Sequence, residues 1–206
     1  MKNLSLQEVK KLFENKDYFI RGNFINEYDF NDDYIDYYKN FILNFNYNKR
    51  NFNYVSNIID LASYFKIFDD NLCLKFKKML NENYHLVIKL SIIVYLENRC
   101  LAINDPSLEN LFLQILNKKI DIVLKNQILI SLFIVTKNEK YFNLLLASLD
   151  RTDDWRSVYR TLDYFINYPI EKELLRVLVD NVKKKHREKN FGEGVTKLLS
   201  QLEQTH

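Results

Sequence analysis

The chain has 206 residues, of which 47% are hydrophobic and 28% are charged, so its composition is that of a globular protein and not of a disordered one. Only three Gly and two Pro occur, which argues against a β-rich or α/β protein with many tight turns and favours helices joined by short polar loops. The 30 basic and 27 acidic residues give a net charge of +3, a near balance that does not favour a dedicated nucleic-acid binder.

Cysteine usage and hydropathy indicate a protein of a reducing compartment. Cys73 and Cys100 are isolated thiols in helical segments, where buried packing is expected in place of a disulfide. The N-terminal residues lack the uninterrupted apolar core of a signal peptide, and the longest apolar runs, SIIVYL and ILISLFIV, are too short to span a bilayer. We therefore expect a soluble, cytoplasmic protein without a membrane partner.

Residues 1–30 are expected to form N-terminal capping helices. Ser5, with Glu8 three residues later, makes a capping box that opens a helix to about residue 15. Asp17 can cap a short second helix that reaches residue 28. A third helix, from residue 32 to about residue 45, begins the series of helix pairs.

The segment from residue 27 to residue 38 mixes carboxylates with tyrosines and resembles an interface more than any other part of the chain. Tyr supplies rigid contact area and a hydroxyl, and carboxylates can meet a basic partner. An acidic, solvated helix start is the alternative, because Asp is favoured near helix N-termini. The residues predicted to contact a partner here are Tyr28, Asp29, Asp32, Asp33, Tyr34, Asp36 and Tyr37.

Between residues 54 and 166 one helical pattern recurs four times. Offsets of 0, +4, +7 and +8 place four side chains on one stripe of a helix, and the sets recur after 34, 36 and 34 residues. A recurring helical unit of this length indicates a stacked helical repeat. The sets are Tyr54, Ile58, Leu61 and Ala62; Ile88, Ile92, Tyr95 and Leu96; Leu124, Ile128, Ser131 and Leu132; and Val158, Leu162, Phe165 and Ile166.

Further helices are predicted from the same periodicity and from capping residues. Asp105-Pro106 is an N-cap followed by a proline at the first helical position, which marks a helix start. The basic segment KKKHREK is expected to be a solvated helix end. The predicted helices are residues 52–64, 69–81, 84–98, one from Asp105, 121–136, 139–149, 153–167, one from Pro169 through residue 182, and 195–202.

The unit LLLASLDRTDDWRSVYRTLDYFI resembles a HEAT repeat, in which an Asp-containing turn precedes a second helix that opens with an apolar and then a basic residue. The turn aspartates are Asp121 and Asp153-Asp154, and the apolar-basic pairs are Ile88-Lys89 and Leu124-Lys125. The last unit departs from this pattern with Val158-Tyr159.

The resemblance covers about residues 31–182. It implies an all-α fold, a right-handed α-solenoid of stacked antiparallel helix pairs with about 11 or 12 helices. We expect a single domain over residues 1–206, closed by a C-terminal capping helix at residues 190–206.

The sequence carries no recognisable catalytic, cofactor-binding or metal-binding set. His85, His186 and His206 are scattered, and none has a second ligand at a spacing that would hold a metal. No nucleophile, zinc-protease, phosphate-loop or dinucleotide motif occurs. We therefore predict no catalytic residue, cofactor or metal. Trp155 is expected to staple the turn between two paired helices.

The predicted function is that of a non-enzymatic protein-binding module. A solenoid binds through the extended concave face that one helix of each pair forms. The polar side chains that we predict on this face, which could equally be a solvated surface, are Asp60, Lys89, Lys125, Arg156 and Arg160.

HEAT-like families include scaffolds, transport receptors, lyase-like proteins, DNA alkylation-repair glycosylases and bacterial toxin antagonists. Within them we favour a bacterial immunity protein, whose acidic, tyrosine-rich segment would occupy the active site of a basic nuclease toxin. One alternative is a nucleic-acid-binding protein of the alkylation-repair type, which would use Lys89, Lys125, Arg156, Arg160 and residues 183–189. A scaffold subunit of a larger complex is the other.

Overall fold

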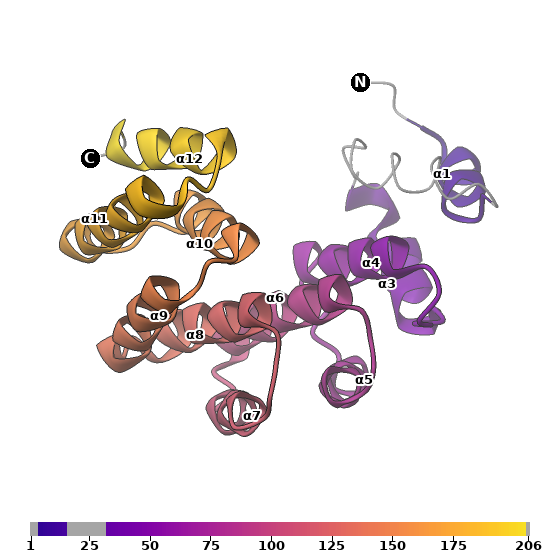
Figure 1. Ribbon diagram of the computed structural model, residues 1–206. Coiled ribbons are helices and arrows are strands. Elements are labelled where there is room, and N and C mark those ends of the chain that lie inside the picture. Colours follow the sequence, from indigo (N-terminus) through magenta and orange to yellow (C-terminus); the bar gives the residue numbers. More distant parts are fainter. Residues whose placement is uncertain (1–3, 16–31, 205–206) are drawn as a thin grey trace. The chain divides into compact units, whose positions relative to one another are not determined.

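The computed structural model describes residues 4–15 and 32–204, which form eleven α-helices and one short 3-10 helix, with no β-strand among them (Figure 1). The prediction of an all-α protein with about eleven helices is confirmed. The second helix expected before residue 28 lies outside the described residues. The chain divides into two compact units, residues 1–108 and residues 109–206; the single domain and the solenoid stay predictions.

The first unit is built around the contact between α4 and α6. The helix α4 also packs against α3, and α5 packs against α6, so most contacts join helices that are neighbours or next neighbours in the chain. The elements are α1 (Leu6–Phe13), the 3-10 helix (Asp32–Tyr34), α3 (Ile35–Asn44), α4 (Phe52–Tyr64), α5 (Asp70–Asn81) and α6 (Leu86–Ile103).

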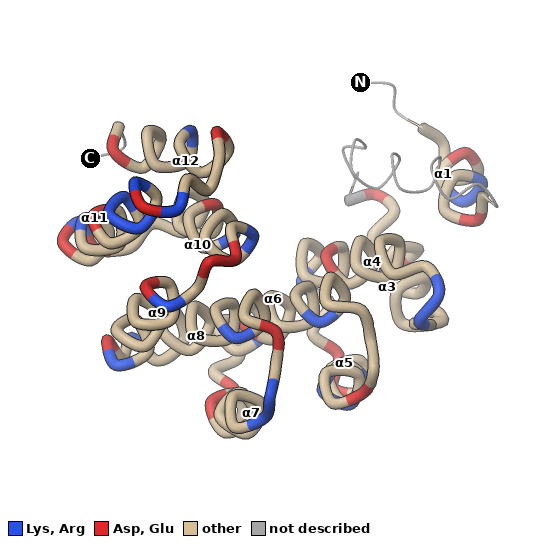
Figure 2. Tube along the Cα trace, in the orientation of Figure 1, with Lys and Arg blue, Asp and Glu red and all other residues tan. Residues whose placement is uncertain are grey.

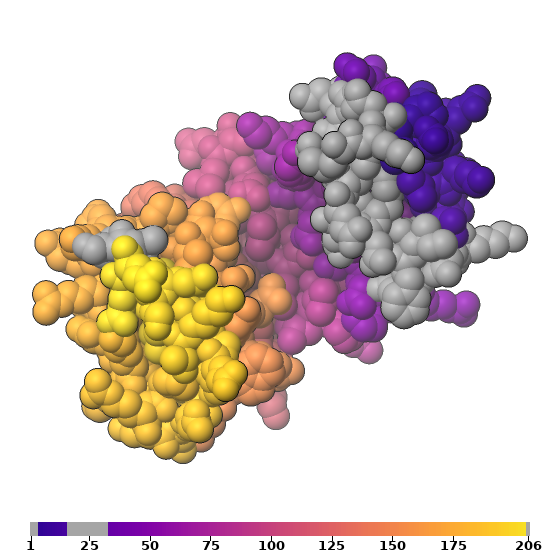
Figure 3. All heavy atoms as spheres, turned by 90° about the horizontal axis from the view of Figure 1, so that it is seen from above, coloured from indigo at the N-terminus to yellow at the C-terminus, as the bar shows by residue number. Residues whose placement is uncertain are grey.

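The second unit repeats this kind of packing. The helix α8 packs against α9 and α10, α10 packs against α12, and α11 packs against α9 and α12. Figure 3 shows α12, in yellow, on the outside of this unit beside α11. Its helices are α7 (Ser107–Leu116), which begins at the end of the first unit, α8 (Ile122–Thr136), α9 (Glu139–Arg151), α10 (Trp155–Asn167), α11 (Lys172–Lys189) and α12 (Glu193–Gln204).

Side-chain caps set where these helices begin, much as the sequence predicts. The capping box of Ser5 and Glu8 is present, and the Asp121 carboxylate accepts the Val123 N–H at 2.8 Å. His85 precedes α6, accepts the Val87 N–H on Nδ1 at 3.3 Å and stacks on Phe52. His85 therefore packs and hydrogen-bonds at the start of α6.

Several helices end in a left-handed residue that is not glycine. Lys66, Asn104, Lys137 and Asn190 have φ of 53°, 53°, 55° and 48°. Asn adopts this conformation more readily than most residues because its short polar side chain can bond locally. This use of Asn and Lys explains how a chain with three glycines closes so many helices.

The repeated stripe forms the core of both units. All of its sixteen side chains are buried except Ile166, which is half-buried. In α8 burial extends beyond the stripe, because Asn126 and Gln127 are buried as well and Lys125 is the one exposed residue of that helix.

The basic segment at residues 183–189 forms the last turns of α11, as expected for a helix end. Lys185 and Lys189 form ion pairs with Asp153, and Lys183 pairs with Glu203. Figure 2 shows the acidic stretch between α9 and α10 in red and the basic end of α11 in blue. The segment is therefore only partly the solvated helix end that we expected.

Candidate functional site

The predicted acidic interface is only partly visible. Tyr28 and Asp29 lie outside the described residues, and Asp32 begins the 3-10 helix. Asp33 and Asp36 are exposed at the start of α3, as an interface or a solvated helix start would both require.

Tyr34 and Tyr37, the two predicted contact tyrosines that the structure describes, are used in packing. Tyr34 is half-buried, and its hydroxyl donates to the Leu4 carbonyl at 3.1 Å. Tyr37 packs edge-on against Phe13, and Lys10 lies over its ring at 5.3 Å. Burial, helped by the charge of Glu14, raises the pKa of Tyr37 to about 12. Both rings therefore have a structural role that leaves less area for a partner.

A depression of about 550 Å³ opens beside Tyr37. Its described lining residues combine aromatic rings with the carboxylate of Glu14 and the amides of Asn40, Asn44 and Asn46. The Tyr37 hydroxyl is buried without a hydrogen-bond partner. Among the described residues that line it, the depression offers amide groups and a carboxylate but no positive charge that would select an anion.

Asp60 and Lys89, the other predicted residues of the first unit, lie on α4 and α6. Asp60 is exposed and Lys89 is half-buried. Lys125, Arg156 and Arg160 belong to the second unit, so the five predicted polar residues form two separate sets. In the second set, Arg156 and Arg160 lie on α10 and Lys125 lies on α8.

The first turn of α10 exposes an aromatic ring beside two basic side chains. Trp155 is 55% exposed, and its indole lies edge-on to Tyr159 with the ring centroids 6.4 Å apart. Arg156 and Arg160 follow on the same helix and are both exposed. The expectation that Trp155 staples the turn between paired helices is therefore wrong, because a packed staple would lose most of its exposure.

The physical reason is a shift of one residue in the helix start. In the repeat, position 155 corresponds to Asn51, His85 and Asp121, each of which is the residue before its helix. The helix α10 begins one residue earlier, because Asp154 is its N-cap and the Asp154 carboxylate accepts the Arg156 N–H at 3.0 Å. Trp155 thus becomes the first helical residue, to the side of the buried stripe.

Arg156 lies in the first turn of α10 and pairs with Asp154, the residue that caps this helix. Its Nε and Nη2 donate to the two carboxylate oxygens of Asp154 at 3.0 and 2.6 Å. The pKa of Arg156 is raised, mostly by this hydrogen bond and to a smaller extent by the charge of Asp121.

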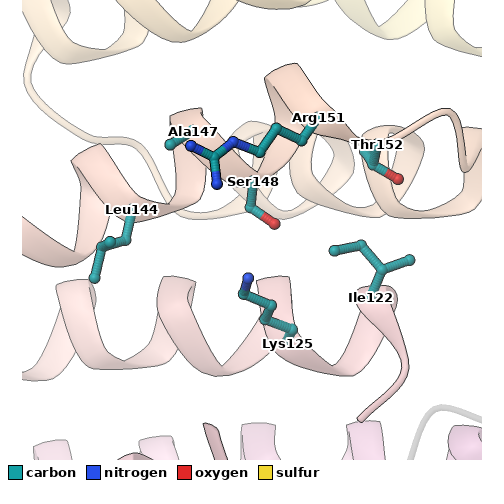
Figure 4. A pocket seen from close by; sticks show the side chains of 7 residues that line it. All are labelled: Ile122, Lys125, Leu144, Ala147, Ser148, Arg151 and Thr152. Carbon is teal, nitrogen blue, oxygen red and sulfur yellow. The ribbon is translucent and has the colours of Figure 1, made fainter. Parts of the chain in front are cut away.

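A cavity of about 230 Å³ lies between α8 and α9, near the first residue of α8, and is called the α8–α9 cavity below. Figure 4 shows the side chains of Lys125 and Arg151 converging on it near Ser148. Lys125 was predicted as a partner-binding residue, whereas Arg151 was missed because the predicted helix ended at residue 149. The cavity is lined by Ile122, Lys125, Leu144, Ala147, Ser148, Arg151 and Thr152.

The wall of this cavity is fixed by a buried chain of hydrogen bonds. The Ser148 hydroxyl donates to the Asn126 side-chain oxygen at 2.6 Å, and the Asn126 amide donates to the Ser157 hydroxyl at 2.6 Å. All three side chains are buried. They join α9, α8 and α10, so the cavity is held by three helices.

The described His, Cys and carboxylate side chains form no metal-binding group, and the two thiols are buried. Among residues 4–15 and 32–204, no three His, Cys, Asp or Glu side chains are grouped so as to hold a metal ion. Cys73 and Cys100 are buried free thiols, which agrees with the packing predicted for them. Burial raises the pKa of both thiols and so favours the unreactive protonated form.

No described helix combines the length and the apolar character that a membrane crossing requires. The features that remain as a candidate site are the exposed first turn of α10 and the α8–α9 cavity. Comparisons of the chain with family models, with curated proteins and with solved structures found no match.

Proposed function

We propose that this chain is a non-enzymatic protein-binding module, built as a right-handed α-solenoid of HEAT-like helix pairs. The contacts of α4 with α6, of α8 with α10 and of α9 with α11 support the architecture, because each joins helices two apart in the chain. Stacked pairs produce this pattern.

The observation that carries the proposal is the exposed Trp155 beside Arg156 and Arg160. Trp and Arg are the side chains that most often dominate the binding energy of protein interfaces. A large ring that is 55% exposed leaves apolar area in contact with water, and a partner would remove that area from water. The proposed interface of the second unit therefore centres on the first two turns of α10.

Within this class we favour a bacterial immunity protein that neutralises a nuclease toxin. The exposed carboxylates of Asp33 and Asp36 support this finer proposal, since they are available to a basic active site. Replacing both by Lys should weaken toxin binding and remove most of its salt dependence. Unchanged affinity would eliminate the acidic segment as the inhibitory element.

Affinity capture from a lysate of the producing cell tests the protein-binding proposal. The wild-type chain and the control variant Tyr64→Ala, which removes an exposed ring of the first unit, should retain one stoichiometric protein after nuclease treatment. Trp155→Ala should lose about tenfold or more in affinity for that protein, as an interface hot spot does. Equal retention by both variants would contradict the proposed interface.

Nuclease treatment also separates the nucleic-acid alternative. A captured species that disappears with nuclease, together with binding that falls steeply with salt, would favour the alkylation-repair type of protein. The structure gives this alternative little support in the second unit, because Lys185 and Lys189 pair with Asp153 and Arg156 pairs with Asp154. These pairs neutralise cations that would otherwise contact phosphates.

A further inference from the structure

We propose that the α8–α9 cavity binds the carboxylate of one acidic side chain of the partner protein as an anchor. This inference rests on the protein-binding function proposed above and names the chemistry that the partner would present.

The first argument is the state of the two cations that line the cavity. Neither Lys125 nor Arg151 forms an ion pair with any described residue, although both side chains reach the same space (Figure 4). Most of α8 is buried, and Lys125 is its one exposed residue and its one charged residue. Lys125 is therefore the one position at which α8 presents a charge at the surface.

Five other cations of the second unit form ion pairs with carboxylates, whereas Lys125 and Arg151 share one cavity without such a pair. The paired cations are Arg156, Arg176, Lys183, Lys185 and Lys189. Two unpaired cations that share one cavity repel each other, and a bound anion would relieve that repulsion.

Size and lining narrow the ligand to a single side chain. A volume of about 230 Å³ lies below the roughly 300 to 1,000 Å³ of small-molecule sites. Ile122, Leu144 and Ala147 form an apolar wall that suits the methylene groups of an acidic side chain. The Thr152 hydroxyl oxygen accepts the Asp154 N–H at 3.0 Å, and its own hydrogen can be donated to a ligand.

The wall is also preorganised. Ser148 is 5% exposed and is held by Asn126, which in turn is held by Ser157. The arrangement of α8 and α9 that brings Lys125 and Arg151 together is therefore set before any ligand arrives. A rigid site loses less conformational entropy on binding than a flexible one.

Nearby carboxylates favour one carboxylate over a nucleic-acid backbone. Asp121 caps α8 beside the cavity, and Asp150, Asp153 and Asp154 flank Arg151 and Thr152 along the chain. A single negative group can enter between the two cations, whereas a continuous polyanion would also approach these four carboxylates. An extended phosphate backbone is thus disfavoured by the same surface.

The direct test uses small probes and NMR of the full chain. N-acetylglutamate amide should cause saturable shifts of the amides at residues 122–125 and 147–152. N-acetylglutamine amide, which lacks the charge, should not. The double variant Lys125→Gln/Arg151→Gln should bind the acidic probe about tenfold more weakly, as expected for the loss of two exposed charge pairs. The control variant Lys140→Gln, on the exposed first turn of α9, should bind like the wild type.

The inference is overturned if the acidic probe gives no saturable shift, if the double variant binds it as well as the wild type, or if inorganic phosphate or a short oligonucleotide binds more tightly there. Capture of the partner separates this failure from that of the proposed function. Capture of no protein by the wild type would refute the protein-binding proposal. Capture of the same protein, equally tightly, by the wild type and the double variant would refute only the role of the cavity.

Discussion

The two units contain the same kind of helices but differ in charge and in the polar contacts that join those helices. Residues 1–108 carry 14 basic and 14 acidic residues, whereas residues 109–206 carry 16 basic and 13 acidic residues, so the net charge of +3 belongs to the second unit. Twenty of the chain's 30 aromatic residues lie in the first unit. The first unit is thus neutral and aromatic, and the second is basic and more aliphatic.

In the first unit, tyrosine hydroxyls satisfy backbone carbonyls near helix ends. Tyr54 donates to the Phe13 carbonyl at 3.0 Å, and Tyr95 donates to the Ile67 carbonyl at 2.8 Å. Tyr47 and Tyr84 make similar bonds. The rings of Tyr47, Tyr54 and Tyr95 are buried, and each hydroxyl donates to a backbone carbonyl at or beyond a helix end.

In the second unit, side chains bond to one another across three helices through Ser148, Asn126 and Ser157. Such a chain of bonds forms at one relative position of the helices, because all three groups must meet. A hydrogen bond from one tyrosine to one carbonyl restricts the relative position of the helices less. The first unit also has side-chain bonds between two helices, at Ser56 with Ser91 and at Asn98 with Ser63. The second unit differs in that one buried chain of bonds joins three helices, and this unit holds the candidate site.

The largest expected effect breaks a buried ion network of the first unit, whereas the pairs of Asp153 with Lys185 and Lys189 in the second unit involve an exposed carboxylate. Arg99 is buried and donates to Asp70 at 2.5 Å and to Asp105 at 2.8 Å. Arg99→Met should lower the free energy of unfolding by about 3 kcal/mol, because Asp105 then lacks its nearest cation. Urea denaturation measures the loss, with the exposed Arg50→Met as control.

Hydrogen exchange of the Arg99→Met variant sharpens the comparison. Faster exchange confined to residues 32–108 would show that the two units open separately. Equal acceleration in residues 109–204 would show that they unfold together, and the difference between them would then be one of chemistry alone.

A somewhat smaller effect concerns the carboxylate of the same network. Burial raises the pKa of Asp105, but hydrogen bonds from Ser107 and the charge of Lys77 outweigh it and bring the pKa down to about 2. A folded-state pKa below the unfolded value near 4 stabilises the protein above pH 4, and this stability is lost as the pH falls toward 2. The difference in stability between wild type and Asp105→Asn should therefore close between pH 4 and pH 2.

That pH dependence can be measured by urea denaturation at several pH values. A difference that stays constant down to pH 2 would contradict the lowered pKa. Glu82→Gln, which changes an exposed carboxylate of the same unit, provides the control.

Asn126→Ala tests the polar chain of the second unit. The hydroxyls of Ser148 and Ser157 would each lose a partner in a buried site, at a cost of about 2 kcal/mol. The exposed Asn143→Ala on α9 should change stability by less than about 0.5 kcal/mol. If both variants are equally stable, the buried chain does not hold the three helices together.

The smallest effect belongs to a single tyrosine of the first unit. Tyr54→Phe keeps the ring but removes the bond to the Phe13 carbonyl, which should cost about 1 kcal/mol. Tyr64→Phe, at an exposed position of the same helix, should be neutral. A loss for Tyr54→Phe as large as that for Asn126→Ala would remove the distinction drawn between the two kinds of polar contact.

The helices could be predicted from the sequence because their signals are local. The predicted and observed bounds of α4 coincide at residues 52 and 64, and α5 and α8 begin one residue after the predicted first residues, Asp69 and Asp121. A capping residue and an apolar stripe act within a few residues of each other, so both are visible in one sequence.

The site could be predicted only in part, because it depends on how helices pack. Lys125, Arg156 and Arg160 were identified from their place off the apolar stripe, and all three are exposed. The cavity needs Arg151 from the end of another helix. The pair of Lys189 with Asp153 joins residues that are far apart in the chain. No local pattern shows such contacts, because they depend on the register between helices.

The unusual burial of α8 has a consequence for the synthesis of the protein. Eleven of its fifteen residues are buried in the finished structure, and the helices that cover it within its unit, α9 and α10, follow it in the chain. A nascent chain that has emerged only as far as Thr136 therefore presents an apolar helix without those covers. This state lasts until α10 is complete, roughly 2 to 6 s later at ordinary rates of translation. During that interval the apolar residues of α8 are open to aggregation. Rapid docking of α9, or a chaperone bound at the ribosome, would cover them.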